Sequence, residues 1–377
     1  MQKKIKLLHI TSSLKMGGAE SLLCDLIKNM DTTMFEHHVI YFHDGPHSVH
    51  LKELGIPLHQ IKGLVSLYDP VFCARLYAHI KKINPDIMHT LLWAANLFGR
   101  MCAHVLNIPV VCAMHNNVDQ DGFIRALFDR ATLKMADKFI AVSEGVAESM
   151  RKRDAWLPAH KIQIIPNGID FKNLQIKNEQ AKKSRQELGL SSDHFVIGSV
   201  GRFMPVKRYD LMLESFALLY AQYSHARLVL VGIGDMEMQL RKLAAHLRID
   251  HAVTFIIGQP AYQYYSLFDC FSLSSDKEGI SIALLEAMSF GLPCVVTSSE
   301  SSHAVLQHEI NGLIVPAGNV QQLSQAWAGL MGNKLLKELL GDCARKTVVQ
   351  EFDYKKMVSS YQTCFKDICA VGEHYSI

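Results

Sequence analysis

Short apolar runs rich in β-branched residues alternate with segments of helical periodicity through the first half of the chain. The pattern predicts a helix at residues 19–30 and further helices between several of the strands. Strands are predicted at residues 5–11, 37–42, 86–90, 109–115, 138–143 and 161–167. Alternation of strand and helix is typical of a doubly wound parallel sheet.

The second half of the chain repeats this plan, although no sequence repeat is visible. Helices are predicted at residues 210–223 and 238–247 and around Glu286, and strands at 194–202, 226–234, 253–258, 269–275 and 293–298. Residues 175–190 are polar and predict a linker or the first helix of a second domain. We therefore expect an α/β protein with Rossmann-like domains at residues 1–175 and 176–351. A ligand would lie in a cleft between them, off the carboxyl ends of the strands.

The composition agrees with a folded protein of two domains. A chain of 377 residues exceeds what one hydrophobic core usually serves. Hydrophobic residues make up 49% of the chain and charged residues 20%, which excludes a disordered chain. The formal net charge of +3 is too small to indicate a nucleic-acid partner.

The cysteines and the apolar runs indicate a cytoplasmic protein. The nine cysteines form no C-x-x-C pair, and several, such as Cys112 and Cys294, lie in apolar runs typical of reduced core residues. No run approaches the roughly 18 apolar residues that a membrane span needs. The basic start of the chain leads into a predicted strand, which argues against a signal peptide.

Two carboxylates stand out in the segment from Ser274 to Pro293. Glu278 lies in a predicted loop and Glu286 in a short apolar helix, where an unpaired carboxylate would be costly to bury. If residues 279–281 (Gly279, Ile280 and Ser281) form the first turn of that helix, their N–H groups favour an anion. The alternative is that Glu278 is a solvated loop residue and that Glu286 is a charge on the helix surface.

Arg202 and Lys207 flank a predicted strand-to-helix turn that Gly201 shapes. Two cations beside a helix N-terminus suit a diphosphate, because arginine can bind two oxygens and lysine supplies a point charge. The alternative is a solvated basic turn. In the first half, Gly17 and Gly18 form a strand-to-helix turn that lets backbone approach a phosphate or sugar, although plain turns also use glycine.

Other motifs narrow the chemistry. His115 ends a predicted strand at the edge where ligands bind, or is a structural histidine. Gly232 and Gly234 resemble half of a dinucleotide fingerprint, but Glu237 takes the place of the third glycine, which argues against a nicotinamide site. Residues 119–121 have the D-x-D form of metal-dependent sugar transferases, which we attribute to chance. With no zinc spacing, phosphate chemistry without a metal fits best.

Together these residues resemble the retaining glycosyltransferases of the GT-B fold, family 4 type, over nearly the whole chain. Glu278 and Glu286, with seven residues between them, match that family's E-x7-E motif. The matching segments are GGAE (17–20), AMH (113–115), IPNGID (165–170), SVGRFMPVKRYD (199–210), LVLVGIGD (228–235), EGISIALLEAMSFGLPCVV (278–296) and NGLIVPAGN (311–319).

The resemblance implies a transferase that moves a sugar from a nucleotide-diphosphate donor, UDP- or GDP-linked, to a glycan or lipid-linked acceptor with retention of configuration and no metal cofactor. It assigns Glu286 to the ribose, Glu278 and His115 to the donor sugar, and Arg202 with Lys207 to the diphosphate. The backbone of residues 279–281, the Gly17-Gly18 turn and residues 255–258, which include Gly258, complete the expected donor contacts.

The resemblance also implies that a C-terminal helix at 352–370 returns to the first domain, and that acceptor contacts come from residues 43–70 and 116–125. Arg208 departs from the family, which often has glycine after this lysine. The basic amphipathic segment 123–139 predicts either peripheral contact with the inner face of an anionic membrane or a core-facing helix with a solvated basic face. The rival functions are a nucleotide-sugar-binding protein without catalysis and a GT-B sugar-nucleotide epimerase.

Overall fold

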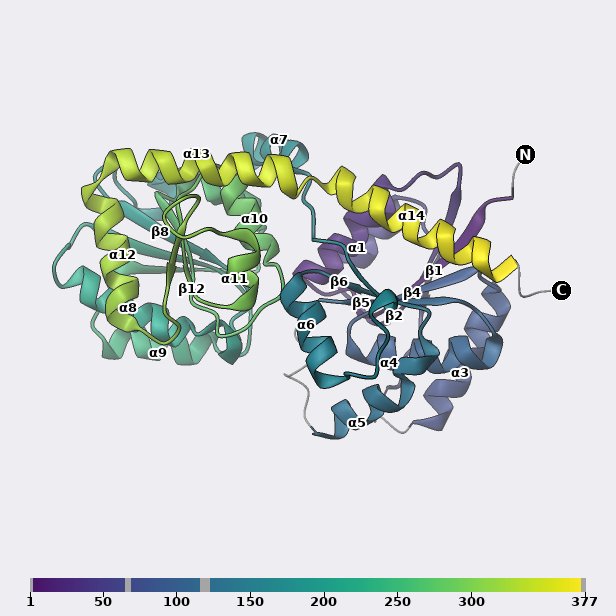
Figure 1. Ribbon diagram of the computed structural model, residues 1–377. Coiled ribbons are helices and arrows are strands. Elements are labelled where there is room, and N and C mark those ends of the chain that lie inside the picture. The colour runs from purple at the N-terminus through teal and green to yellow at the C-terminus, as the bar shows by residue number, and fades with distance from the viewer. Residues whose placement is uncertain (1–2, 65–68, 116–122, 374–377) are drawn as a thin grey trace. The chain divides into compact units, whose positions relative to one another are not determined.

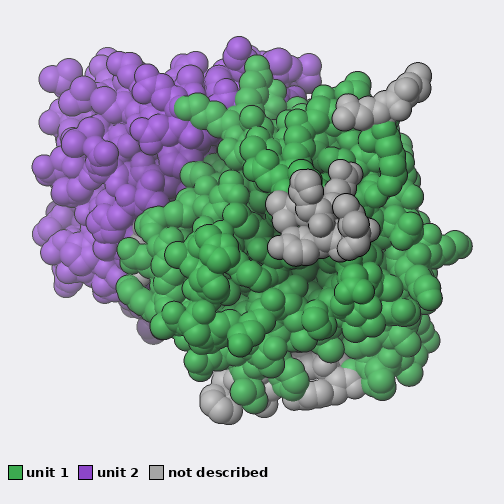
Figure 2. Space-filling view, turned by 45° about the vertical axis from the view of Figure 1, so that its right-hand side comes forward, with its two compact units in different colours: residues 1–168, 354–377 green, residues 169–353 purple. Residues whose placement is uncertain are grey.

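The computed structural model describes residues 3–64, 69–115 and 123–373. The chain forms two compact units, which are coloured separately in Figure 2. Unit 1 consists of residues 1–168 and 354–377, and unit 2 of residues 169–353. The sequence-based domain boundary at residue 175 falls inside a helix of unit 2, because Asp170 caps that helix by accepting the N–H of Asn173.

Among its described residues, unit 1 contains a parallel sheet of seven strands with the order β3-β2-β1-β4-β5-β6-β7. In that order the strands are β3 (Leu58–Gln60), β2 (Phe35–His43), β1 (Ile5–Ser13), β4 (Ile87–Leu91), β5 (Val110–Met114), β6 (Lys138–Ala141) and β7 (Ile162–Ile164). The helices are α1 (Gly18–Asn29), α2 (Pro46–Glu53), α3 (Pro70–Ile83), α4 (Trp93–Leu106), α5 (Phe123–Thr132), α6 (Glu144–Arg153) and α14 (Tyr354–Glu373).

Helices cover both faces of the unit 1 sheet. Figure 1 shows α1 and α14 on one side and α3, α4 and α5 on the other. The α3–α4 side holds the larger apolar cluster, in which Phe72 and Phe98 pack edge to face at 5.3 Å. Helix α14 joins this unit because Tyr361 and Phe365 are buried against His89 of β4, each at a ring distance of 5.4 Å.

The described part of unit 2 contains a six-stranded parallel sheet with the order β10-β9-β8-β11-β12-β13. In that order the strands are β10 (Val253–Ile257), β9 (Ala226–Gly232), β8 (Phe195–Val200), β11 (Cys270–Leu273), β12 (Cys294–Thr297) and β13 (Leu313–Val315). The helices are α7 (Phe171–Ala181), α8 (Tyr209–Tyr220), α9 (Glu237–His246), α10 (Ile282–Ser289), α11 (Glu300–Val305), α12 (Val320–Gly332) and α13 (Lys334–Glu351).

Two apolar clusters stabilise unit 2. One includes side chains of α8, α9 and α12, with Trp327 fully buried, and the other includes side chains of α10 and the end of α13. The sheet order reverses at β8, whose neighbours β9 and β11 lie on opposite sides of it. In such sheets the carboxyl ends of the strands on either side of the reversal form the usual binding site. The prediction of two doubly wound α/β units is confirmed.

Candidate active site

The loop after β8 is held against the end of β9 by close backbone packing. A methyl group on Gly232 would lie 2.0 Å from the carbonyl oxygen of Gly201, and one on Gly234 would lie 2.4 Å from that of Phe203. The N–H of Phe203 also donates to the carbonyl of Ile233 at 3.0 Å. The two glycines that resemble half of a dinucleotide fingerprint therefore position the loop that carries Arg202.

Lys207 and Glu278 form an ion pair between the loops that follow β8 and β11. The Lys207 Nζ lies 2.6 Å from Oε1 of Glu278, and the two side chains are only 20% and 11% exposed. The Ser275 hydroxyl donates to the same carboxylate oxygen. Glu278 is thus a fixed, nearly buried carboxylate, and the alternative of a solvated loop residue does not apply.

Arg202 presents a second cation from the same loop. Its side chain is exposed and makes no ion pair with any residue in the described part of the chain. A guanidinium in this state can bind two oxygens of one phosphate. The two cations predicted for the diphosphate therefore differ: Arg202 is available to an anion, whereas Lys207 is already paired.

Arg208 has a structural role that the sequence did not reveal. Its φ of 50° lies in the left-handed region, which favours glycine. Its guanidinium donates to Asp210 and Asp276, each at 3.1 Å, and the hydrogen bond to Asp210 raises its pKa. The Ser274 hydroxyl bonds to the carbonyls of Lys207 and Arg208 at 2.9 and 2.8 Å. These contacts fasten the Lys207 turn to the loop that carries Glu278.

The helix that follows Glu278 begins slightly later than predicted. Ser281 is its N-cap and accepts the N–H of Leu284 at 3.4 Å, so Gly279 and Ile280 precede the helix. A cavity of about 20 Å³ lies beside this start, room for roughly one water molecule. Its polar lining consists of Ser275, Glu278, Ser281, Thr297, Ser299 and Ser302. Hydroxyl groups therefore surround the carboxylate that the sequence assigns to the donor sugar.

Glu286 has the partner that a carboxylate in an apolar helix requires. The hydroxyl of Tyr265 donates to its Oε2 at 2.6 Å. Tyr265 is fully buried and stacks on Phe290 at 5.3 Å, and burial together with the charge of Glu286 raises its pKa. Glu286 itself is half-buried, and the Tyr265 hydroxyl orients its carboxylate.

Gly258 lies at the end of the neighbouring strand β10. Its φ is +66°, a left-handed conformation that favours glycine, and its N–H donates to the carbonyl of Gly232 at 3.1 Å. Hydrogen bonds and close contacts thus link the ends of β10, β9 and β8 through Gly258, Gly232 and Gly201. Two of the predicted donor-binding glycines of unit 2, Gly201 and Gly258, are therefore joined through Gly232, whereas Gly279 lies in the loop after β11.

In unit 1, Gly17 and Gly18 open helix α1. Gly17 is extended, with φ of −178°, so its backbone does not require glycine. A methyl group there would lie 2.3 Å from Oε2 of the buried Glu20, which would have to move. Close packing against Glu20 thus accounts for Gly17 by itself, and both predicted explanations of the turn remain open.

His115 follows β5 at the same edge of the unit 1 sheet. Burial lowers its pKa to about 4, so the imidazole is neutral at pH 7. Its Nε2 is covered and has no hydrogen-bond partner among the described residues. The next segment, including Asp119 and Asp121 of the D-x-D motif, lies outside the described residues. Within the residues that are described, no group of three or more His, Cys, Asp or Glu side chains is arranged to hold a metal ion.

Comparison with known proteins identifies the family. The Glycosyltransferase Family 4 model matches residues 16–173, and the model for glycosyl transferases group 1 matches residues 180–347. The chain belongs to the family 4 glycosyltransferases of the GT-B fold. The matched residues begin after β1 and include the other strands of both sheets, together with the strand-end motifs described above.

Relatives of this glycosyltransferase span most of its length. The UDP-Gal:alpha-D-GlcNAc-diphosphoundecaprenol alpha-1,3-galactosyltransferase of Escherichia coli is 23% identical over 97% of both chains. The N-acetyl-alpha-D-glucosaminyl L-malate synthase of Bacillus anthracis is 25% identical over 80% of each. Among solved structures, Anabaena HepE in complex with UDP-glucose has a TM-score of 0.84 at 20% identity, covering 96% of this chain and 100% of HepE.

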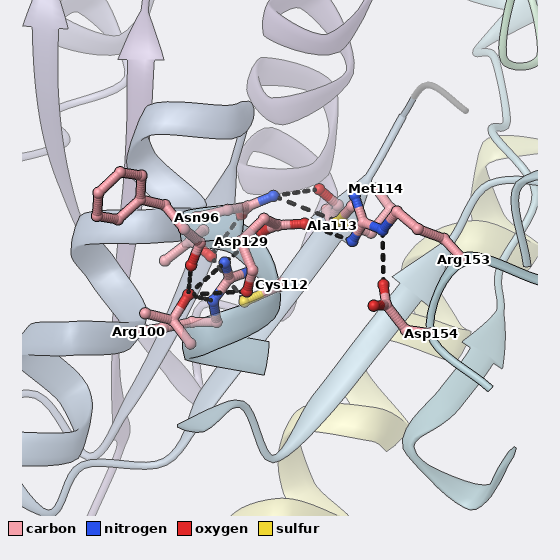
Figure 3. A network of polar contacts seen from close by, with 11 residues as sticks. Asn96, Arg100, Cys112, Ala113, Met114, Asp129, Arg153 and Asp154 are labelled. Carbon is pink, nitrogen blue, oxygen red and sulfur yellow. Dashed lines mark hydrogen bonds and ion pairs between the residues drawn. The ribbon is translucent and has the colours of Figure 1, made fainter. Parts of the chain in front are cut away.

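A buried polar network in unit 1 escaped sequence analysis. Arg100 of α4 is fully buried and donates to Asp129 of α5, which also accepts a 2.6 Å bond from Arg153 of α6 (Figure 3). Nearby, Asn96 donates to the carbonyl of Ala113 at 3.1 Å. The network joins α5 and α6 to α4. Through Asn96, helix α4 also holds the backbone of β5 at Ala113, two residues before His115.

A chain of three buried histidines crosses the centre of the same sheet. Nδ1 of His9 lies 3.0 Å from Nδ1 of His89, and Nε2 of His9 lies 3.0 Å from Nδ1 of His37. Three neutral rings carry three N–H groups, of which the two bonds use two. The third must lie on Nε2 of His37 or His89, and neither atom has a partner among the described residues.

The histidine chain had a signal in the sequence, because His9 and His89 interrupt runs that are otherwise apolar. The contact between them could not be predicted without the register of β1 and β4, in which these two residues are directly opposite. Burial lowers the pKa of His9 well below its usual value, that of His89 to about 3 and that of His37 to about 4. All three are therefore neutral at pH 7.

Proposed function

We propose that this glycosyltransferase takes its sugar from a nucleotide-diphosphate donor and transfers it with retention of configuration and without a metal ion. The observation that carries the proposal is the fixed Lys207–Glu278 pair on the same strand-end loops as the exposed Arg202. Cations at this edge would stabilise a diphosphate, and the carboxylates would accept hydrogen bonds from hydroxyl groups.

The donor roles in the proposal follow the chemistry of each group. Arg202 and Lys207 bind the diphosphate, Glu278 binds hydroxyls of the sugar and Glu286 binds those of the ribose. Support for a uridine nucleotide comes from Anabaena HepE, whose structures are described as complexes with UDP and with UDP-glucose. When the sugar enters, its hydroxyls would replace part of the hydrogen bonding that Ser275 and Lys207 now give to Glu278.

The proposed reaction breaks the bond between the anomeric carbon and the phosphate oxygen. The electron pair leaves with the diphosphate, whose growing negative charge Arg202 and Lys207 stabilise more in the transition state than in the ground state. The acceptor oxygen bonds to the anomeric carbon on the same face, and its proton passes to the departing phosphate. Loss of transfer with intact donor binding on mutating another carboxylate would contradict this proton route.

The acceptor in the proposal is a hydroxyl of a glycan or lipid-linked sugar, recognised by unit 1. The Escherichia coli relative is named for an acceptor in which N-acetylglucosamine is joined through a diphosphate to undecaprenol. His115, neutral at pH 7, and the Gly17 turn are the unit 1 residues that the proposal assigns to the reaction.

The deciding experiment incubates the protein with UDP-glucose, UDP-galactose or UDP-N-acetylglucosamine and an acceptor panel. Release of UDP that depends on acceptor indicates transfer, and the anomeric coupling constant of the product in proton NMR reports retention. Persistence of activity in EDTA tests metal independence. Donor binding without UDP release across the panel would favour the non-catalytic binding protein, and a change of the sugar within the donor would favour the epimerase.

Peripheral membrane contact is a further part of the proposal. In α5 the side chain of Leu127 is exposed and the Arg125 guanidinium lies over the Trp93 ring at 5.0 Å, and after α5 the Lys134 ammonium lies over the Trp156 ring at 5.3 Å. Basic and exposed apolar groups in one short segment favour contact with anionic lipid. No helix among the described residues is long and apolar enough to cross a bilayer. Failure to co-sediment with vesicles containing phosphatidylglycerol would remove this part.

A further inference from the structure

A cavity of about 300 Å³ lies in unit 1, apart from every residue that the proposed mechanism uses. It sits at the carboxyl ends of β1, β2 and β3, which are neighbours in the sheet. Its polar lining consists of Lys15, His43, Asp44, Gln60 and Lys62. The carboxyl edge of a parallel sheet is where ligands bind, and this volume suits a small molecule such as a sugar phosphate.

Two lysines, Lys15 and Lys62, supply the positive charge of the cavity. Neither Lys15 nor Lys62 forms an ion pair with any residue that the structure describes, whereas Lys3 pairs with Asp86 at 2.9 Å. The one carboxylate of the lining, Asp44, is occupied by its own chain. It accepts the N–H of Gly45 at 2.9 Å, and the hydroxyl of Ser48 and that amide are the main causes of its lowered pKa. The positive charges of Lys52 and Lys62 lower this pKa further, by smaller amounts.

The backbones that carry these groups are fixed. The N–H of Lys15 donates to the Ser13 hydroxyl at 3.0 Å. A methyl group on Gly45 would lie 2.4 Å from the carbonyl of Leu14 and 2.5 Å from Cα of Lys15, so the two strand-end turns are in direct contact. The carbonyl of Lys62 accepts from Arg75 at 3.4 Å. Two lysines on separate, anchored turns therefore face one cavity.

We propose that this cavity binds the anionic group, phosphate or carboxylate, of a sugar acceptor. Lys15 and Lys62 bind the anion, and Asp44 with Gln60 accept or donate hydrogen bonds to the sugar hydroxyls. The inference rests on the proposed function, because it assigns the acceptor to unit 1. It narrows the acceptor from any glycan to one that carries negative charge close to the sugar.

The test is a set of calorimetric titrations on the full-length protein. UDP is titrated first and then held at saturation, so that it occupies the proposed diphosphate site. Glucose 1-phosphate, glucuronate and glucose are the probes for phosphate, carboxylate and neutral sugar. The variants are Lys15→Gln, Lys62→Gln and the double variant, with Lys81→Gln on α3 as an exposed control outside the cavity.

We expect an anionic probe to bind more tightly than glucose and to lose about tenfold or more in affinity in the double variant, as two charge-assisted bonds require. Lys81→Gln should bind as the wild type does. Preference for glucose 1-phosphate over glucuronate identifies phosphate as the anion, and the reverse identifies carboxylate. Equal binding of charged and neutral probes, no binding of either anion, or unchanged affinity in the double variant overturns the inference.

The two proposals fail separately in this design. Absence of UDP binding contradicts the donor site of unit 2, and the probe titrations can then be repeated without UDP. Intact UDP binding in every variant, together with equal thermal unfolding temperatures, shows that the lysine substitutions act at the cavity alone. Lys15 and Lys62 are both exposed, so their replacement by glutamine leaves the core intact.

Discussion

Replacing Glu286 with alanine separates the donor-binding role of this carboxylate from its contribution to the fold. The side chain accepts the Tyr265 hydroxyl at 2.6 Å, and Tyr265 is fully buried. The only other acceptor recorded for that hydroxyl among the described residues is the carbonyl of Ala283 at 3.5 Å, which is long for such a bond. Glu286→Ala therefore leaves a buried hydroxyl poorly satisfied, at a cost of about 1 to 3 kcal/mol in unfolding free energy.

The expected effect on donor binding is larger and independent of Tyr265. A carboxylate that accepts hydrogen bonds from ribose hydroxyls contributes roughly 1.5 to 3 kcal/mol, which corresponds to a tenfold to hundredfold loss of UDP affinity. Tyr265→Phe alone removes the hydroxyl and leaves Glu286, which is half-buried and can bind water instead. It should cost about 1 kcal/mol in stability and change UDP affinity little.

The double variant Glu286→Ala, Tyr265→Phe makes the test sharp. Removing both partners of a buried hydrogen bond is less costly than removing one, so its unfolding free energy should recover above that of Glu286→Ala. Its UDP affinity should stay low. Denaturant unfolding gives the stability and isothermal titration gives the affinity. Wild-type UDP affinity in Glu286→Ala, or recovery of affinity in the double variant, refutes the ribose assignment.

Three further predictions concern other parts of the molecule. Lys207→Ala leaves Glu278 without its cation and should lower kcat by about 10²-fold or more, whereas an unchanged kcat would remove Lys207 from the mechanism. Arg208→Gly relieves the strain of a positive φ but removes two exposed ion pairs, so unfolding free energy should change by less than about 1 kcal/mol while kcat falls; a large loss of stability would show that the ion pairs dominate. His9 and His89 stay neutral in the fold, but unfolded imidazoles gain protons below their usual pKa of 6.5. Stability should therefore fall from pH 7 to pH 5 by up to about 1.4 kcal/mol per pH unit for each; equal unfolding free energies at the two pH values contradict this.

Most regular elements could be predicted from the sequence because their apolar periods are long and unambiguous. The strands predicted at 86–90 and 253–258 are observed at 87–91 and 253–257. The strands β3 and β13, which were not predicted, have three residues each, too short for a period to appear. The equally short β7 was found because it lies in a longer apolar run at 161–167. The domain boundary was placed late because residues 175–190 read as a linker, whereas their first part continues helix α7.

The candidate site was predicted residue by residue, but its pairings were not. Lys207 and Glu278 each suited a ligand, and nothing in the sequence indicates that they contact one another. That contact depends on the strand order, which makes β8 and β11 neighbours although β9 and β10 lie between them in the chain. Polar contacts between strand-end loops follow from the strand order, and a single sequence does not supply that order at this precision.

Arg208 shows how a backbone angle that the sequence does not reveal changes the interpretation of a site. From the sequence it is an extra cation beside Arg202 and Lys207, with no assigned role. Its left-handed φ directs the guanidinium to Asp210 and Asp276, so its charge is neutralised within the protein. Since Asp276 lies two residues before Glu278, the arginine holds the carboxylate loop where the Lys207 ammonium can reach it. Of the three cations of this turn, Arg202 is exposed, Lys207 pairs with Glu278 and Arg208 pairs with Asp210 and Asp276.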